Sequence, residues 1–257
     1  MQSSAASTFS QEFRVRYEEC GTSGEIRASV YLRYLQELAF AHSAALGYPL
    51  IWYEANRLFW LVRRAQLLVH APARYGEALT GTTQVVGMRR IFARRRNTIR
   101  RTSDGAPLVT VVVDWIFTHD GVVTARIPAE FVGAFPSLEG TVAPAPLEEP
   151  DVPPGAVWTP VQIRFSDCDA MGHANNAVYL DLVDDAIIRA GGSAALERYP
   201  RTYDLQYHAA ARAGAELRDL VWTANDVWHY RLESPDGVPY LHGRLRGGDD
   251  SGLAGEP

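Results

Sequence analysis

The chain contains no lysine: all 25 of its basic residues, in a chain of 257, are arginine. Without lysine the protein cannot form a Schiff base with pyridoxal phosphate or with a carbonyl substrate. A phosphate-binding loop of the Gly-Lys-Ser/Thr type is also excluded, because that loop requires a lysine beside its glycines. The reactive groups must therefore be found among carboxylates, histidines, thiols and arginines.

Cysteine is nearly as scarce, with Cys20 and Cys168 as the only two. Two cysteines outside a Cys-x-x-Cys pair make no disulfide framework, which favours a reducing compartment. The N-terminal residues show no basic segment followed by an apolar one, so we expect no secretion signal. No run of 18 apolar residues is present that would span a membrane. These absences predict a cytoplasmic protein that is not inserted in a membrane.

Charge is distributed unevenly along the chain. Residues 1–128 contain 16 arginines and 10 acidic residues, whereas residues 129–257 contain 9 arginines and 20 acidic residues. The asymmetry predicts two units with different surfaces. The net charge of −5 is too acidic for a nucleic-acid-binding protein, so we expect no nucleic-acid partner.

Seven of the 15 prolines lie between Pro136 and Pro160. Such a segment favours extended backbone and is predicted to be a linker. The glycine-rich and acidic end of the chain is predicted to be a disordered tail. The resulting domain prediction is 12–134 for the first domain, 135–160 for the linker, 161–246 for the second domain and 247–257 for the tail.

The two predicted domains begin with a repeat. Residues 16–34 align with residues 164–182 at a constant offset of 148, with six identities in 19 positions. The identical pairs are Arg16/Arg164, Cys20/Cys168, Gly24/Gly172, Val30/Val178, Tyr31/Tyr179 and Leu32/Leu180. A duplication of one ancestral unit explains this pattern.

Each repeat predicts the same order of elements. A short strand leads through a polar loop into an amphipathic helix, and four β-rich segments follow the helix. The sequences Asp104-Gly105 and Asp236-Gly237 predict matching hairpin turns. The predicted strands and helices at the start of each repeat are 12–17 and 29–46, then 161–165 and 176–190. The fold class is therefore α+β, with two domains in which an antiparallel sheet wraps around a central helix.

The loop before the second helix, residues 166–176, concentrates the reactive side chains. It contains two carboxylates, a thiol, an imidazole and two amides directly before a helix N-terminus. That terminus offers unpaired backbone N–H groups and the positive end of a dipole, which suit a developing oxyanion. Asp169 also fits an ordinary helix cap or Asx-turn, and Asn175 and Asn176 fit an N-cap pair. A metal site built from Asp167, Asp169 and His173 has too few oxygen ligands for a hard cation, so we predict no metal and no cofactor.

The stretch Arg-Phe-Ser-Asp-Cys-Asp-x-x-Gly-His-x-Asn-Asn-x-x-Tyr-Leu (residues 164–180) resembles the signature of hotdog-fold thioesterases of the 4-hydroxybenzoyl-CoA thioesterase superfamily. The tandem order, with Phe59-Trp60-Leu-Val-Arg63-Arg64 after the first helix, resembles the acyl-ACP thioesterases. The resemblance implies two tandem hotdog domains. It also implies hydrolysis of a fatty acyl thioester of ACP or CoA, as in fatty acid biosynthesis and lipid metabolism.

The resemblance also implies roles for individual residues. Asp169 corresponds to the carboxylate that acts as base or nucleophile, and His173 to the histidine that orients substrate or water. Gly172, Asn175 and Asn176 form the helix start that we expect to stabilise the oxyanion. Two positions depart from the usual acyl-ACP pattern: Met171 stands where that group has asparagine, and Ala210 or Ala211 stands where it has glutamate.

The first repeat lacks the reactive side chains. Gly21 occupies the place of Asp169, and Glu25 the place of His173. We therefore predict that the first domain holds the acyl chain, with aromatic residues as a candidate wall, although ordinary core packing is the commoner role for any single one of them. These residues are Trp52, Tyr53, Phe59 and Trp60.

Seven arginines fall between Arg89 and Arg101, and alternation along a strand puts Arg94, Arg96 and Arg100 on one face. This face predicts a docking surface for an acidic carrier protein or for CoA phosphates, with a solvated sheet face as the alternative.

Three functions compete for this sequence. A thioester releases a thiol of pKa about 8.5, so one carboxylate and an oxyanion site suffice for its hydrolysis. A non-catalytic acyl-binding protein and a hotdog hydratase or dehydratase are the alternatives, although the Asp-x-Asn-Pro-x-His pattern of the hydratases is absent. Two hotdog domains in one chain allow either a monomer or a homodimer.

Overall fold

The computed structural model describes residues 8–135, 146–148 and 150–248. The predicted linker lies partly outside the described residues, as do residues 249–257 of the predicted tail. The chain divides into two compact units, each described below by itself. Unit 1 comprises residues 1–65 and 70–144, and unit 2 comprises residues 66–69 and 145–257.

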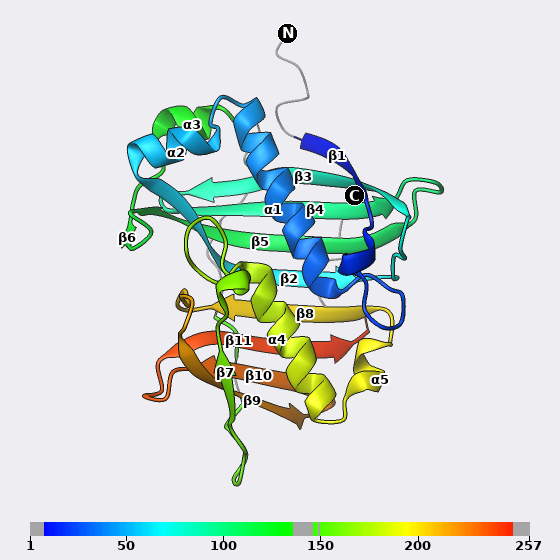
Figure 1. Cartoon of the computed structure of the whole chain (residues 1–257). Helices are drawn as coiled ribbons and strands as arrows, with labels where there is room; N and C mark the ends of the chain where they lie inside the picture. Colours follow the sequence, from blue (N-terminus) through cyan, green and yellow to red (C-terminus); the bar gives the residue numbers. More distant parts are fainter. Residues whose placement is uncertain (1–7, 136–145, 149, 249–257) are drawn as a thin grey trace. The chain divides into compact units, whose positions relative to one another are not determined.

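Unit 1 is an antiparallel sheet with one long helix, α1, against strands β1 and β3 (Figure 1). The sheet order is β1-β3-β4-β5-β2, with β6 paired to β5. The last residues of β2 belong to unit 2. The elements are β1 (Thr8–Arg14), α1 (Ala28–Ala45), α2 (Leu50–Asn56), β2 (Leu58–Val69), β3 (Ala78–Arg89), β4 (Phe92–Arg101), β5 (Pro107–His119), β6 (Val123–Thr124) and α3 (Ala129–Gly133).

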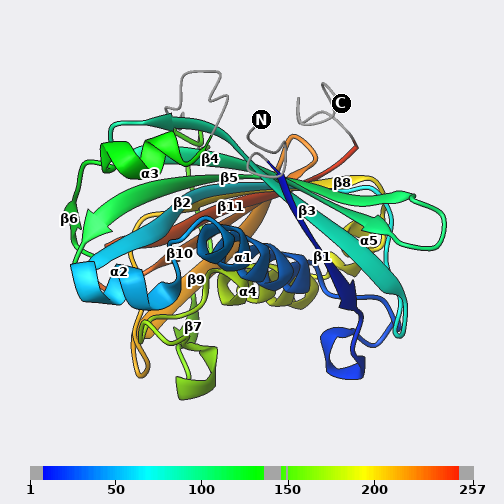
Figure 2. The same cartoon turned by 90° about the horizontal axis from the view of Figure 1, so that it is seen from above.

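Unit 2 repeats this design, with α4 against β9 and β10. Its sheet order, β7-β9-β10-β11-β8, matches that of unit 1 strand for strand. Figure 2 shows each long helix on one side of its own sheet. The elements are β7 (Thr159–Gln162), α4 (Asn176–Arg189), α5 (Ser193–Leu196), β8 (Arg201–Tyr207), β9 (Glu216–Ala224), β10 (Val227–Glu233) and β11 (Pro239–Gly247).

Both long helices are held by an apolar stripe that the helical period places against the sheet. In α1 the buried residues include Tyr31, Leu35 and Leu38, and in α4 they include Tyr179 and Val183. These side chains form the core between each helix and its sheet. This packing fixes the position of each helix, and so it also fixes the position of the loop that leads into the N-terminus of that helix.

The sequence-based boundaries agree with the structure for the long elements and differ for the short ones. The two helices were expected at 29–46 and 176–190 and lie within one residue of those bounds. The first strand was expected at 12–17 but covers Thr8–Arg14, because the chain after Val15 turns into a 3-10 helix, Tyr17–Glu19. The short helices α2, α3 and α5 were not predicted.

Candidate active site

The loop that enters α4 is held by backbone hydrogen bonds. Asp169 N–H donates to the His173 carbonyl (2.9 Å), and Gly172 N–H donates to the Asp169 carbonyl (2.9 Å). The Asn175 N–H donates to the Asp167 carbonyl (2.9 Å). Gly172 has a φ of +75°, in the left-handed region that glycine adopts most easily. The loop is therefore a tight, fixed turn that presents its side chains at the start of the helix.

The Asp169 carboxylate accepts one hydrogen bond on each oxygen. Met171 N–H donates to Oδ1 (3.0 Å), and the Asn175 side-chain Nδ2 donates to Oδ2 (3.3 Å). The first contact is the Asx-turn that the sequence allowed. A carboxylate has about four acceptor positions, so each oxygen keeps a lone pair for a water molecule or a substrate. The structural contacts thus orient Asp169 without using up its capacity to act as a base.

The start of α4 differs from the expected N-cap pair. Asn175 alone is the N-cap: its side-chain Oδ1 accepts from Ala177 N–H (3.0 Å). Asn176 is the first residue of the helix, and among the described residues its N–H donates no hydrogen bond. In the predicted oxyanion set, the N–H groups of Gly172 and Asn175 are already bonded within the loop. The backbone N–H of Asn176 is therefore the member of this set that has no hydrogen-bond partner among the described residues.

The remaining loop residues have distinct surroundings. Asp167 is buried and forms an ion pair with Arg164 (Nη2 to Oδ1, 2.7 Å), which agrees with a structural carboxylate. Cys168 Sγ donates to the Arg164 carbonyl (3.8 Å) and is half-buried. The His173 imidazole is half-buried and forms no hydrogen bond within the described part of the chain, which leaves both ring nitrogens for substrate or water.

The segment between β8 and β9 is hydrogen-bonded to the loop and to α4. Ala174 N–H donates to the Ala211 carbonyl (2.7 Å), and Ala211 N–H donates to the buried Tyr179 hydroxyl (3.0 Å). In the sequence, Tyr179 stood out only as a repeat identity. In the structure, its hydroxyl connects α4 to the segment between β8 and β9. Ala211 is one of the two positions where the acyl-ACP pattern has glutamate. Here the backbone of Ala211, and not a carboxylate, faces the loop.

Unit 1 contains a second copy of the same loop. Gly21 N–H donates to the Glu25 carbonyl (2.8 Å), and Gly24 N–H donates to the Gly21 carbonyl (3.0 Å). The Arg27 N–H donates to the Glu19 carbonyl (3.0 Å). Each bond corresponds to one in unit 2 at the offset of 148. The backbone is thus duplicated in detail, whereas Gly21, Glu25 and Arg27 replace Asp169, His173 and Asn175.

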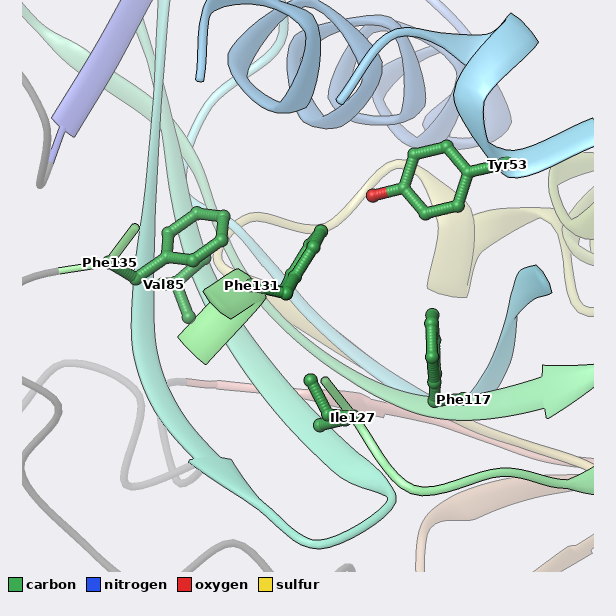
Figure 3. Close-up of a cluster of buried hydrophobic side chains, with 6 residues drawn as sticks. All are labelled: Tyr53, Val85, Phe117, Ile127, Phe131 and Phe135. Atoms are coloured by element: carbon green, nitrogen blue, oxygen red, sulfur yellow. The ribbon is translucent and has the colours of Figure 1, made fainter. Parts of the chain in front are cut away.

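The predicted aromatic wall is largely brought together in unit 1. A buried cluster contains Tyr53, Val85, Phe117, Ile127, Phe131 and Phe135. Figure 3 shows Tyr53, Phe117 and Phe131 converging from α2, β5 and α3. Trp52 and Trp60 are half-buried and pack against this aromatic cluster, with the Trp60 and Phe117 rings 4.5 Å apart. Phe59 is not among the cluster residues, because alternation along β2 turns its side chain away from the side of Trp60.

The arginine-rich strand β4 is more constrained than expected. Arg94 donates two hydrogen bonds to Asp114, from Nε to Oδ1 (2.6 Å) and from Nη2 to Oδ2 (2.9 Å), and these bonds raise the pKa of Arg94. The two N–H groups are therefore not available to a partner. Arg96 is half-buried on the same face of the strand. Arg100 is exposed and donates to the Gly105 carbonyl (3.0 Å). The exposed charge of this face is therefore smaller than the number of arginines indicates.

In each unit an antiparallel sheet packs against one long helix, which is the fold of the hotdog-fold thioesterases. More specifically, the chain belongs to the acyl-ACP thioesterase family. Residues 6–134 match the model of the acyl-ACP thioesterase N-terminal domain, and residues 156–233 match that of the C-terminal domain. The protein is thus a thioester hydrolase, which decides against the acyl-binding and hydratase alternatives. No curated protein sequence matches the chain.

Three solved structures share the fold over nearly the whole chain. A protein assigned as an oleoyl thioesterase from Lactobacillus plantarum is 20% identical, with a TM-score of 0.80, and the match covers 96% of this chain and 99% of that one. An acyl-ACP thioesterase from Bacteroides thetaiotaomicron is 15% identical, with a TM-score of 0.76 and coverage of 93% and 97%. The 12:0-ACP thioesterase from Umbellularia californica is 19% identical, with a TM-score of 0.75 and coverage of 93% and 92%.

Proposed function

We propose that the chain is a tandem pair of hotdog domains that hydrolyses fatty acyl-ACP, with the reaction in unit 2 and the acyl chain held by unit 1. The observation that carries this proposal is the duplicated loop. Two loops with the same backbone bonds differ at the positions of Asp169, His173 and Asn175, so the backbone shape of the loop does not require these side chains. The domain-model matches to both halves support the tandem arrangement.

Asp169 is the proposed base or nucleophile. Its two loop contacts fix the carboxylate, and the remaining lone pairs accept a proton from water or attack the thioester carbonyl directly. The Asn176 N–H and the positive end of the α4 dipole stabilise the negative charge that develops on the carbonyl oxygen when its carbon is attacked. The thiol leaves readily because its pKa is about 8.5, so little general-acid assistance is required. His173 orients the water or the substrate.

Unit 1 supplies the acyl-binding residues in this proposal. Trp52 and Trp60 are half-buried at the edge of the aromatic cluster, so their rings are available to an aliphatic chain. Burial of a fatty chain contributes about 0.8 kcal/mol per methylene group. The family assignment supports ACP as the carrier, and Arg96 remains the predicted docking residue for that acidic protein. Because Arg94 is paired with Asp114, we expect it to contribute less than Arg96 to docking.

The test is thiol release from acyl-ACP and acyl-CoA substrates of several chain lengths. Asp169→Ala and Asp169→Asn are each expected to lower kcat by about 10²- to 10⁴-fold, the usual contribution of a positioned base. Asp169→Asn keeps an acceptor for Met171 N–H, so it separates catalysis from loop structure. Glu25→Ala, at the position in unit 1 that matches His173, is the control and is expected to retain wild-type activity. Full hydrolysis by folded Asp169→Ala would refute the mechanism.

A further inference from the structure

Strand β4 places one arginine in the interior of unit 1. Residues 93, 95, 97 and 99 point to the buried side of the strand, and they are Ala93, Arg95, Asn97 and Ile99. Arg95 is only 8% exposed. A charged side chain in this position requires an explanation, because arginine is almost never this buried unless it is paired.

The partners of Arg95 are all uncharged groups. Its Nη1 donates to His42 Nδ1 (3.0 Å) and to the Thr83 hydroxyl (3.4 Å), and the guanidinium lies 5.9 Å from the centre of the Phe135 ring. Burial lowers the pKa of Arg95 to about 10, so the group remains positively charged at neutral pH. Within the described part of the chain no carboxylate forms an ion pair with it.

The neighbours on the same strand show the contrast. Arg94 pairs with Asp114, and Arg101 pairs with Glu77, yet both side chains are more exposed than Arg95. A buried charge without a counter-charge carries a desolvation cost that an opposite charge offsets. Asn97, two residues along on the same side, also has a side-chain oxygen without a hydrogen-bond partner in the described residues. On the buried side of β4, Arg95 therefore lacks a counter-charge and the side-chain oxygen of Asn97 lacks a hydrogen-bond donor, among the described residues.

Arg95 lies at one end of the aromatic cluster. The Phe135 ring that it contacts is 5.2 Å from Phe131, and Phe131 is 5.9 Å from Trp60, measured between ring centres. A continuous series of rings thus connects the half-buried tryptophan with the buried cation (Figure 3 shows Phe135 and Phe131). A ligand lying along these rings would meet apolar surface first and a guanidinium last.

We propose that Arg95 binds a carboxylate at the far end of the acyl group, so that the enzyme accepts ω-carboxyacyl thioesters. This inference rests on the proposed function, in which unit 1 holds the acyl chain. The guanidinium fork matches a carboxylate in geometry and charge, and a bound carboxylate supplies the counter-charge that the described residues do not provide. A hydroxyl group would satisfy a hydrogen bond but not the charge, so it is recognised less well.

The experiment compares thioesters of equal chain length that end in a methyl, a hydroxyl or a carboxylate group. For the wild-type protein, kcat/KM is expected to be highest for the carboxylate. Arg95→Met is expected to lower the carboxylate-to-methyl ratio of kcat/KM by about 10- to 100-fold, the range of a charge-assisted hydrogen bond. Arg74→Met removes a surface arginine of the same unit that pairs with Glu25, and it is expected to leave the ratio unchanged.

A ratio that Arg95→Met does not alter would overturn the proposal, and so would an equal preference for hydroxyl and carboxylate ends. A calorimetric measurement on the wild-type protein covers the case in which the variant does not fold. The monomethyl ester of a long-chain α,ω-dicarboxylic acid is expected to bind at least 10-fold more tightly than the methyl ester of the monocarboxylic acid of equal length, which has no carboxylate, and equal affinities would overturn the proposal. Failure of the proposed function has a different signature, since no substrate would then release thiol, whereas the binding comparison would still report on Arg95.

Discussion

Asn175 connects the helix cap to Asp169, the proposed catalytic carboxylate, and Asn175→Asp is expected to turn that connection from attraction into repulsion. In the wild-type protein Oδ1 of Asn175 accepts from Ala177 N–H (3.0 Å), while Nδ2 donates to Asp169 Oδ2 (3.3 Å). Aspartate caps helices as well as asparagine does, and its charge is favourable at a helix N-terminus. The cap is therefore kept, but a carboxylate oxygen replaces the donor that faces Asp169.

The size of the effect follows from the short distance between the two side chains. Two unit charges about 4 Å apart repel each other by about 1 kcal/mol in water and by about 4 kcal/mol at an effective dielectric constant of 20. One pH unit corresponds to about 1.4 kcal/mol. The two carboxylates at positions 169 and 175 therefore share a proton up to a pH about 1 to 3 units higher than the pH at which Asp169 loses its proton in the wild-type protein. If an ionised Asp169 is required, the acidic limb of the pH profile of kcat/KM moves upward by that amount.

The assay is thiol release between pH 4.5 and 9 with a reagent that reports in acid. Arg27→Asp, at the matching helix cap of unit 1, places a carboxylate in the duplicated loop with a charge change of −2 instead of −1, and it is expected to leave the limb in place. Thermal unfolding at pH 8 checks that both variants are folded. An unchanged acidic limb in folded Asn175→Asp would refute the assignment of Asp169 as the group that must be ionised.

Two further predictions concern stability. Burial raises the pKa of Asp184 to about 7, despite the bond from the Tyr203 hydroxyl (2.9 Å) and the nearby Arg201. The unfolded state loses this proton near pH 4, so the free energy of unfolding is expected to fall as pH rises from about 4 to 7. Asp184→Asn should remove that slope and stabilise the protein by about 1–3 kcal/mol at pH 8 in urea unfolding, and a persisting slope would contradict this. In Gly192→Ala the new Cβ would lie 2.4 Å from Trp228 Cζ2, so a loss of about 1–3 kcal/mol is expected. Gly133→Ala meets no atom within 4 Å and is the control; equal urea midpoints for the two variants would count against the packing argument.

Periodicity along the chain was enough to place the long elements. The apolar stripes of α1 and α4 and the turn residues Asp104-Gly105 and Asp236-Gly237 are local signals, and the structure follows them closely. The helices α2 and α3 were not predicted because each has seven residues or fewer, which is too short for its aromatic residues to show a helical period. Their positions are set by packing in the aromatic cluster, which is a contact between distant parts of the sequence.

The loop chemistry was predictable by residue type but not by hydrogen bond. The sequence indicated Asp169 and the helix start, yet it could not show which backbone N–H groups are already occupied. The same limit applies to Arg95, which alternation separates from Arg94 and Arg96 without revealing that its neighbours carry no opposite charge. Met171, which departs from the acyl-ACP pattern, donates through its backbone to Asp169, so the Asx-turn does not depend on the side chain at that position.

The absence of a long apolar run in the sequence predicted a protein that is not inserted in a membrane. Among the described residues, no helix is long and apolar enough to cross one.

The paired loops have a consequence for how such a protein changes over time. Because backbone bonds hold each loop in shape, the side chains at positions 21, 25 and 27 were free to mutate after duplication without unfolding the unit. Under the proposed mechanism, one loop carries the reactive side chains, and the unit that holds the other loop can serve a different ligand. The same independence makes the loop of unit 1 a starting point for protein engineering. A Cβ at Gly21 would have its nearest neighbours at 3.9 Å, so the first side-chain atom of an aspartate fits there without crowding.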